Sequence, residues 1–145
     1  MKRKLRPFFH LLFVSTLFFS CKEEIISSVT EEPVKDIAGT WRVVSLTRNG
    51  EELTERMDLS KFRISFKDDG TYTLQDRIAF AVSEAGSYKL NDPQYPSSLL
   101  LTQPNQATQS VNFQFPVVQG KRQLSLIFSP GCAGNTYQYN LVKEN

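Results

Sequence analysis

The stretch that decides the fold class is residues 61–75, KFRISFKDDGTYTLQ. In its first half every second residue is phenylalanine or isoleucine, and the residues between them are charged or polar. Because successive side chains of a strand point to opposite faces, this alternation predicts a strand with one buried face. Asp69-Gly70 then supplies the positive-φ residues of a tight hairpin, and residues 71–75 resume the alternation. The stretch therefore predicts an antiparallel β-hairpin.

Short runs rich in Val, Ile, Phe, Tyr and Thr continue on both sides of this hairpin, separated by turn residues. We expect a break near Asp76, since one long strand would aim that carboxylate into the apolar face. Leu53 and Met57, four residues apart, indicate a short helix within residues 51–60. Further strands are expected over residues 40–47, 86–90, 98–103, 109–115, 121–128 and 136–143. About eight strands with mostly short loops predict an all-β domain over residues 37–145: an antiparallel up-and-down barrel with a short helix after its first strand.

A basic and then apolar leader precedes this domain. Residues 1–6 carry four Lys or Arg side chains, and residues 7–20 are rich in Phe and Leu without fixed charge. This layout is typical of a secretory signal peptide over residues 1–20 and is too short for a comfortable membrane span. Ser20-Cys21 resembles the end of a bacterial lipobox, with its leucine at Leu17, one position early. The resemblance implies that Cys21 becomes a lipidated N-terminus, carrying palmitate-type acyl chains that anchor the protein; an uncleaved signal anchor is the alternative.

Between the cysteine and the domain, residues 22–36 read KEEIISSVTEEPVKD. They are acidic and lack helix or strand periodicity, so residues 21–36 are expected to form the lipidated cysteine and a flexible tether. Lys22, Glu23 and Glu24 resemble the export signal of surface lipoproteins in Bacteroidetes. That resemblance implies a location on the outer face of the outer membrane, with an ordinary tether facing the periplasm as the alternative.

Removal of the leader changes the chemistry of the chain. Four of the 17 basic residues leave while all 15 acidic residues stay, so the formal charge becomes about −2. The one histidine, His10, leaves as well. These losses argue against nucleic-acid binding and against histidine-based catalysis or zinc binding. With Cys21 acylated, Cys132 is the remaining thiol, expected to be packed because no neighbour in sequence would lower its pKa. We expect no enzyme activity, catalytic residue, metal or cofactor.

Gly39-Thr40-Trp41 resembles the Gly-x-Trp signature of lipocalins. With FKDDGTYTL, GSYKL and NTYQYNLVK, it makes residues 37–145 similar to lipocalin-like lipoproteins of unknown function common in Bacteroidetes. The resemblance implies that Trp41 plugs one end of the barrel beneath a basic residue, for which Lys143 and Arg122 are the candidates. It carries no ligand and no catalytic residue.

An eight-stranded barrel can either be filled by side chains or hold one small ligand. In the first hypothesis a small apolar or amphipathic molecule occupies the barrel, lined by Trp41, Phe62, Phe66, Tyr72, Phe113, Phe115, Tyr137 and Tyr139. In the second the same side chains fill the barrel, and rim loops bind a surface glycan or protein. Those loops are residues 49–60, 91–97, 103–109 and 129–135, with Tyr95 and the amide-rich PNQATQ at 104–109 as contacts. The ligand, the partner and the oligomeric state are not specified by the sequence.

Overall fold

The computed structural model describes residues 31–131 and 134–144. The chain divides into two units, Met1–Glu31 and Glu32–Asn145, and the barrel belongs to the second. The expected signal peptide, the lipidated Cys21, the Lys22-Glu23-Glu24 signal and Cys132 lie outside the described residues. In the described part of the chain, no helix has the length and apolar character needed to cross a membrane.

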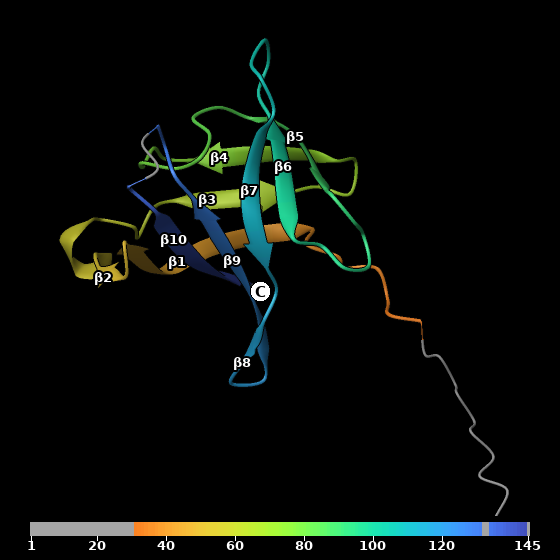
Figure 1. Ribbon diagram of the computed structural model, residues 1–145, viewed down its shortest axis with the longest axis horizontal. Coiled ribbons are helices and arrows are strands. Elements are labelled where there is room, and N and C mark those ends of the chain that lie inside the picture. The colour runs from red at the N-terminus through yellow and green to blue at the C-terminus, as the bar shows by residue number, and fades with distance from the viewer. Residues whose placement is uncertain (1–30, 132–133, 145) are drawn as a thin grey trace, which may run out of the picture. The chain divides into compact units, whose positions relative to one another are not determined.

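Eight strands form the wall of the barrel, and each pairs antiparallel with the next of the eight along the chain. They are β1 (Gly39–Arg48), β3 (Arg63–Phe66), β4 (Thr71–Gln75), β5 (Gly86–Leu90), β6 (Ser98–Thr102), β7 (Gln109–Gln114), β9 (Lys121–Phe128) and β10 (Tyr137–Lys143). β10 also pairs with β1, which closes the sheet (Figure 1). The expected all-β, eight-stranded up-and-down barrel is confirmed.

Three short elements decorate this barrel. The two-residue strand β2 (Glu51–Glu52) pairs with β1, and β8 (Val117–Val118) pairs with the start of β9. The helix expected after the first strand is a single 3-10 turn, η1 (Thr54–Arg56). The β8 hairpin extends beyond the barrel wall, at the bottom of Figure 1.

The hairpin at residues 61–75 forms as expected, with a longer turn. β3 and β4 pair Phe66 with Tyr72, and only Gly70 of the turn takes a positive φ, +79°. The Asp69 carboxylate instead accepts hydrogen bonds from the Thr71 amide at 2.9 Å and the Thr71 hydroxyl at 2.6 Å. The turn therefore spans three residues, 68–70, and Asp69 stabilises it as an acceptor. The expected break after β4 is confirmed, since Asp76 is exposed and takes a φ of +64°.

An up-and-down path places its connections alternately at the two ends of the barrel. The proximal end is formed by residues 32–38 and by the loops 67–70, 91–97 and 115–120. The distal end is formed by the loops 49–62, 76–85 and 103–108 and by residues 129–131 and 134–136. Of the four rim loops singled out from the sequence, 91–97 is proximal and the other three are distal. Tyr95 and residues 104–109 therefore lie at opposite ends and cannot form one binding surface.

Candidate functional site

Side chains fill the barrel between its two ends. The core includes inward-facing residues from β1, β3, β4, β6, β7, β9 and β10, and its largest fully buried members include Trp41, Tyr72 and Tyr139. Six of the eight aromatic residues expected to line a lumen are at most 3% exposed: Trp41, Phe62, Phe66, Tyr72, Phe113 and Tyr139. The other two, Phe115 and Tyr137, are half-buried. These aromatic rings pack against other side chains of the protein, and contacts of this kind lie at both ends of the barrel.

Phe80, from the loop between β4 and β5, closes the distal end. Its ring centroid lies 5.3 Å from that of Phe62, 5.5 Å from that of Phe128 and 5.3 Å from that of Tyr139. The Tyr139 hydroxyl donates to the carbonyl of Ala79, which fixes the loop over the opening. Burial raises the pKa of Tyr139 to about 12, so this donor keeps its proton at neutral pH.

Midway along the wall, Tyr72 contacts Phe66, with centroids 6.5 Å apart. Its hydroxyl is buried and has no hydrogen-bond partner among the described residues. Burial raises the pKa of Tyr72 to about 12, and the nearby Glu84 adds to the effect. The phenol is therefore neutral at physiological pH and offers neither a nucleophile nor a base.

Trp41 lies at the proximal end of the barrel. It is 1% exposed, and its Nε1 donates to the carbonyl of Ile37 at 2.8 Å. Phe115 meets the indole edge-on at a centroid distance of 6.1 Å. The Arg122 guanidinium lies 5.4 Å from the centroid of Phe115, and its Nη1 donates to the Phe115 carbonyl at 2.9 Å. Arg122 thus covers the tryptophan indirectly, through the phenylalanine ring.

Lys143 covers the neighbouring part of β1. It pairs with Trp41 across the β1–β10 seam, and its side chain crosses Gly39. Gly39 has a φ of +123°, and a Cβ there would stand 2.3 Å from the Lys143 Cε. The glycine of the Gly-x-Trp motif therefore serves two purposes: it permits the backbone angle and makes room for the lysine stem. Both basic candidates contribute, at different places.

A hollow of about 420 Å³ opens above this layer. A tight turn with Gly120 at its tip brings the two basic residues at the start of β9 to the rim. Trp41, Phe115 and Val142 form the apolar floor of the hollow, and basic and acidic side chains surround this floor. The full lining is Asp36, Trp41, Phe115, Lys121, Arg122, Val142 and Lys143. An apolar floor beneath three cationic side chains is suited to an amphipathic anion.

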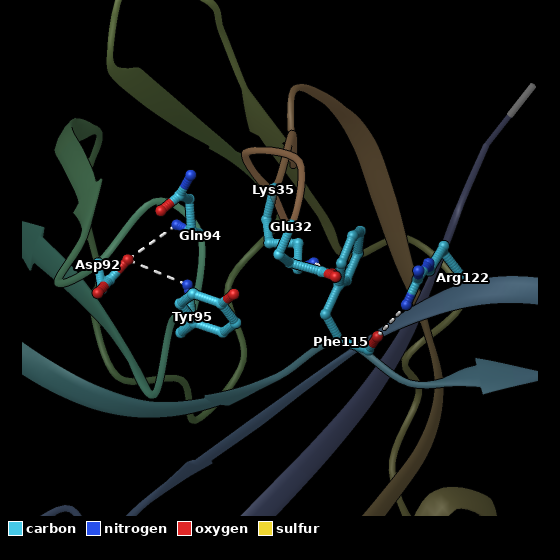
Figure 2. A network of polar contacts seen from close by, with 7 residues as sticks. All are labelled: Glu32, Lys35, Asp92, Gln94, Tyr95, Phe115 and Arg122. Carbon is cyan, nitrogen blue, oxygen red and sulfur yellow. Dashed lines mark hydrogen bonds and ion pairs between the residues drawn. The ribbon is translucent and has the colours of Figure 1, made fainter. Parts of the chain in front are cut away.

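A second hollow, of about 370 Å³, lies on the other side of Phe115 (Figure 2). Its lining is Glu32, Lys35, Gln94, Tyr95, Pro96, Phe113 and Phe115. Glu32 and Lys35 form an ion pair, which lowers the pKa of Glu32. The Asp92 carboxylate accepts from the amides of Gln94 at 2.8 Å and Tyr95 at 3.0 Å, and so shapes this loop. The Tyr95 side chain stays 67% exposed.

The distal loops carry polar contacts of their own. The Arg48 guanidinium donates to the Asn135 side-chain oxygen at 2.7 Å. The Asn49 side-chain amide donates from Nδ2 to the Gly134 carbonyl at 2.9 Å. Among the residues that the structure describes, no group of three or more His, Cys, Asp or Glu side chains could hold a metal ion. The expected absence of catalysis stays a prediction.

The aromatic lining expected from the sequence leaves out three rings that pack with the core: Phe80, Phe128 and Tyr88. Phe128 stacks on Tyr139 at 5.5 Å, and Tyr88 meets Phe66 edge-on at 4.8 Å. Phe128 had a signal, because it lies in phase with Leu124 and Leu126 on a predicted strand. Phe80 had a weaker one, an apolar run of residues 78–82 in a segment that also follows a predicted break.

The chain was compared with protein families, curated proteins and solved structures. No curated protein and no solved structure matches it. A family model described as a domain of unknown function, DUF5004, matches residues 19–142. The match covers the whole barrel except Lys143 at the end of β10 and reaches back past the tether. The chain therefore belongs to the DUF5004 family.

Proposed function

We propose that this protein is a non-catalytic, lipid-anchored lipoprotein of the cell envelope that binds a small amphipathic anion at the proximal mouth of a lipocalin-like barrel. The observation that carries the proposal is the hollow above Phe115, with an apolar floor and the side chains of Lys121, Arg122 and Lys143 at its rim. A carboxylate or phosphate head group fits the cationic rim, because charge-assisted hydrogen bonds from guanidinium and ammonium groups favour such anions. An acyl or aryl tail fits the floor.

The mouth is favoured over the lumen because of the packing inside the barrel. A ligand in the lumen would have to displace rings that are at most 3% exposed, such as Tyr72 and Phe113. Burying an aromatic side chain stabilises a protein by about 1.5–3 kcal/mol, so displacing two or three would consume most of the energy of an ordinary small-ligand complex. The hollow at the mouth exists without any such displacement.

Anchoring is the second part of the proposal. The leader and Ser20-Cys21 support lipidation of Cys21, and Lys22-Glu23-Glu24 supports exposure on the outer membrane surface. The Cys21→Ser variant should incorporate no labelled palmitate in cells, and unchanged labelling would contradict the anchor. Protease treatment of intact cells should digest a surface protein, whereas a periplasm-facing protein would be spared.

Titration with a dansylated fatty acid tests the binding site. The mature chain should bind one probe with saturation, and Arg122→Gln should weaken binding about tenfold, which is the value of one charge-assisted hydrogen bond at a partly exposed site. Arg77→Gln, at the distal end, removes the same charge far from the hollow and should leave the affinity unchanged. Equal losses in both variants would contradict the site. No binding in any variant would favour the other hypothesis, in which rim loops bind a glycan or protein.

A further inference from the structure

Four large hydrophobic side chains are exposed among the residues that the structure describes, and all four lie at the proximal end. They are Val34 at 64%, Tyr95 at 67%, Val117 at 57% and Val118 at 40%. Single exposed hydrophobic residues are common on protein surfaces, but they are normally scattered. Here three separate segments, residues 32–38, the 91–97 loop and β8, contribute to the same end of the barrel.

Contacts hold these segments together. The Lys35 amide donates to the Pro93 carbonyl at 2.7 Å, which ties the segment of Val34 to the loop of Tyr95. Phe115, two residues before β8, lines both hollows and so connects that loop to the base of the β8 hairpin. Figure 2 shows Phe115 between the Asp92–Tyr95 loop and Arg122. The segments that carry the four exposed residues are therefore connected, and we call these four residues the apolar rim.

Basic side chains flank the apolar rim. In the β8 hairpin Val117 pairs with Arg122 and Val118 pairs with Lys121, so a valine and a cation lie side by side at each of the two levels next to the Gln119-Gly120 turn. Lys143 lies on the same side.

Four of the acidic groups at the proximal end have partners within the chain. Glu32 pairs with Lys35, Glu144 pairs with Arg63 at 2.7 Å, and Asp92 accepts from its own loop. Asp36, which lines the hollow, accepts from the Ala38 amide at 2.8 Å.

We propose that the apolar rim, formed by Val34, Tyr95, Val117 and Val118, docks on the surface of an anionic phospholipid membrane, with Lys121 and Arg122 at the lipid phosphates. A projecting hairpin that pairs each valine with a cation suits an interface that is apolar inside and anionic outside, because the long Lys121 and Arg122 side chains can reach the phosphates beside the valines. Tyr95 also suits the membrane–water interface, since the ring of a tyrosine is apolar and its hydroxyl can stay in water.

The length of the chain supports the same occupant. This step rests on the proposed lipidation: ten residues separate Cys21 from Glu32, so a lipid on Cys21 keeps the proximal end within about 40 Å of the bilayer. Tethering makes the second contact intramolecular, so a weak intrinsic affinity is enough to hold the barrel in one orientation. In that orientation the ligand hollow opens at the membrane interface.

Vesicle flotation with residues 21–145 carrying Cys21→Ser measures docking without the lipid anchor. The core of the described residues lies within residues 37–141, so this variant keeps every core side chain. The protein should float with vesicles of equal parts phosphatidylethanolamine and phosphatidylglycerol, and binding should fall as salt rises. It should bind phosphatidylcholine vesicles several-fold more weakly. The double variant Val117→Asp/Val118→Asp should bind the anionic vesicles at least about tenfold less, because two half-inserted valines are lost.

The control is Ala107→Asp/Gln109→Asp, which adds the same two charges at exposed positions of the distal end. It should float like the parent chain. Equal loss in both double variants, no difference between the two vesicle types, or no flotation of the parent would overturn the docking surface. These failures are separate from those of the proposed function, since palmitate labelling tests the anchor and the fatty-acid titration in solution tests the hollow. Val117 and Val118 do not line that hollow but pair with Arg122 and Lys121, so the uncharged double variant Val117→Ser/Val118→Ser should lose vesicle binding and still bind the fatty acid.

Discussion

Replacing Phe80 with alanine tests whether the barrel is a filled body closed at its distal end. Phe80 is half-buried and contacts three aromatic rings, those of Phe62, Phe128 and Tyr139. Aromatic pairs contribute at least about 0.5 kcal/mol each beyond burial, which gives about 1.5 kcal/mol for three. Half of the burial energy of a phenylalanine adds about 1 kcal/mol. The Phe80→Ala variant should therefore lose about 2.5 kcal/mol of its free energy of unfolding.

Urea denaturation followed by Trp41 fluorescence measures this loss. The indole is buried at the proximal end, so its signal reports global unfolding and lies far from the substitution. Tyr95→Ala removes an exposed aromatic ring and should change the free energy of unfolding by less than about 0.5 kcal/mol. A similarly small loss for Phe80→Ala would refute the reasoning, because the 76–85 loop would then contribute little to the core.

The same variant makes a second prediction about ligands. Truncating Phe80 leaves a cavity lined by Phe62, Phe128 and Tyr139, and an apolar cavity of this kind binds small apolar molecules. Indole or benzene at millimolar concentration should raise the melting temperature of Phe80→Ala and leave that of the wild-type protein unchanged. An equal rise in both proteins would show that the wild-type barrel already has an accessible lumen.

Three further substitutions or titrations follow from particular contacts. Gly86→Ala should cost about 3 kcal/mol in urea denaturation, because the new Cβ would stand 2.1 Å from the carbonyl oxygen of Thr102, a backbone atom on the paired strand. Absorbance titration at alkaline pH should show Tyr72 and Tyr139 ionising near pH 12. Their contribution to the free energy of unfolding as neutral phenols should be complete below about pH 10 and lost as the pH rises toward 12. Asp69→Asn should lower stability at neutral pH, and the difference from wild type should shrink as the pH falls below about 4, because hydrogen bonds from Thr71 lower the pKa of the Asp69 carboxyl.

Alternation and turn chemistry were sufficient to predict the barrel wall. The hairpin around Gly70 and the break at Asp76 both follow from local rules, the freedom of glycine to take positive φ and the cost of burying a carboxylate. The turn length was wrong by one residue, because the sequence does not show that Asp69 would accept hydrogen bonds from Thr71 in place of adopting a left-handed backbone.

The site depended on information that local patterns do not contain. Strand register decides that Lys143 crosses Gly39 while Arg122 reaches Phe115. From the sequence, either residue alone could have been the basic residue expected to cover Trp41. Phe80 enters the core from a loop, so no periodicity marks it as buried. The separation of Tyr95 from residues 104–109 could have been predicted, since loops before and after one strand of a meander must lie at opposite ends.

Energy transfer from Trp41 to a bound dansylated fatty acid tests the central claim most directly. Trp41 is the only tryptophan in the chain and lies directly beneath the proximal hollow. We predict that Trp41 emission is quenched with saturation at one probe per chain, and that Arg122→Gln shifts the midpoint about tenfold while Arg77→Gln does not. The contradicting result is saturable binding whose midpoint is unchanged in Arg122→Gln but which is lost when core side chains inside the barrel are replaced. That result would place the ligand in the lumen and not at the mouth.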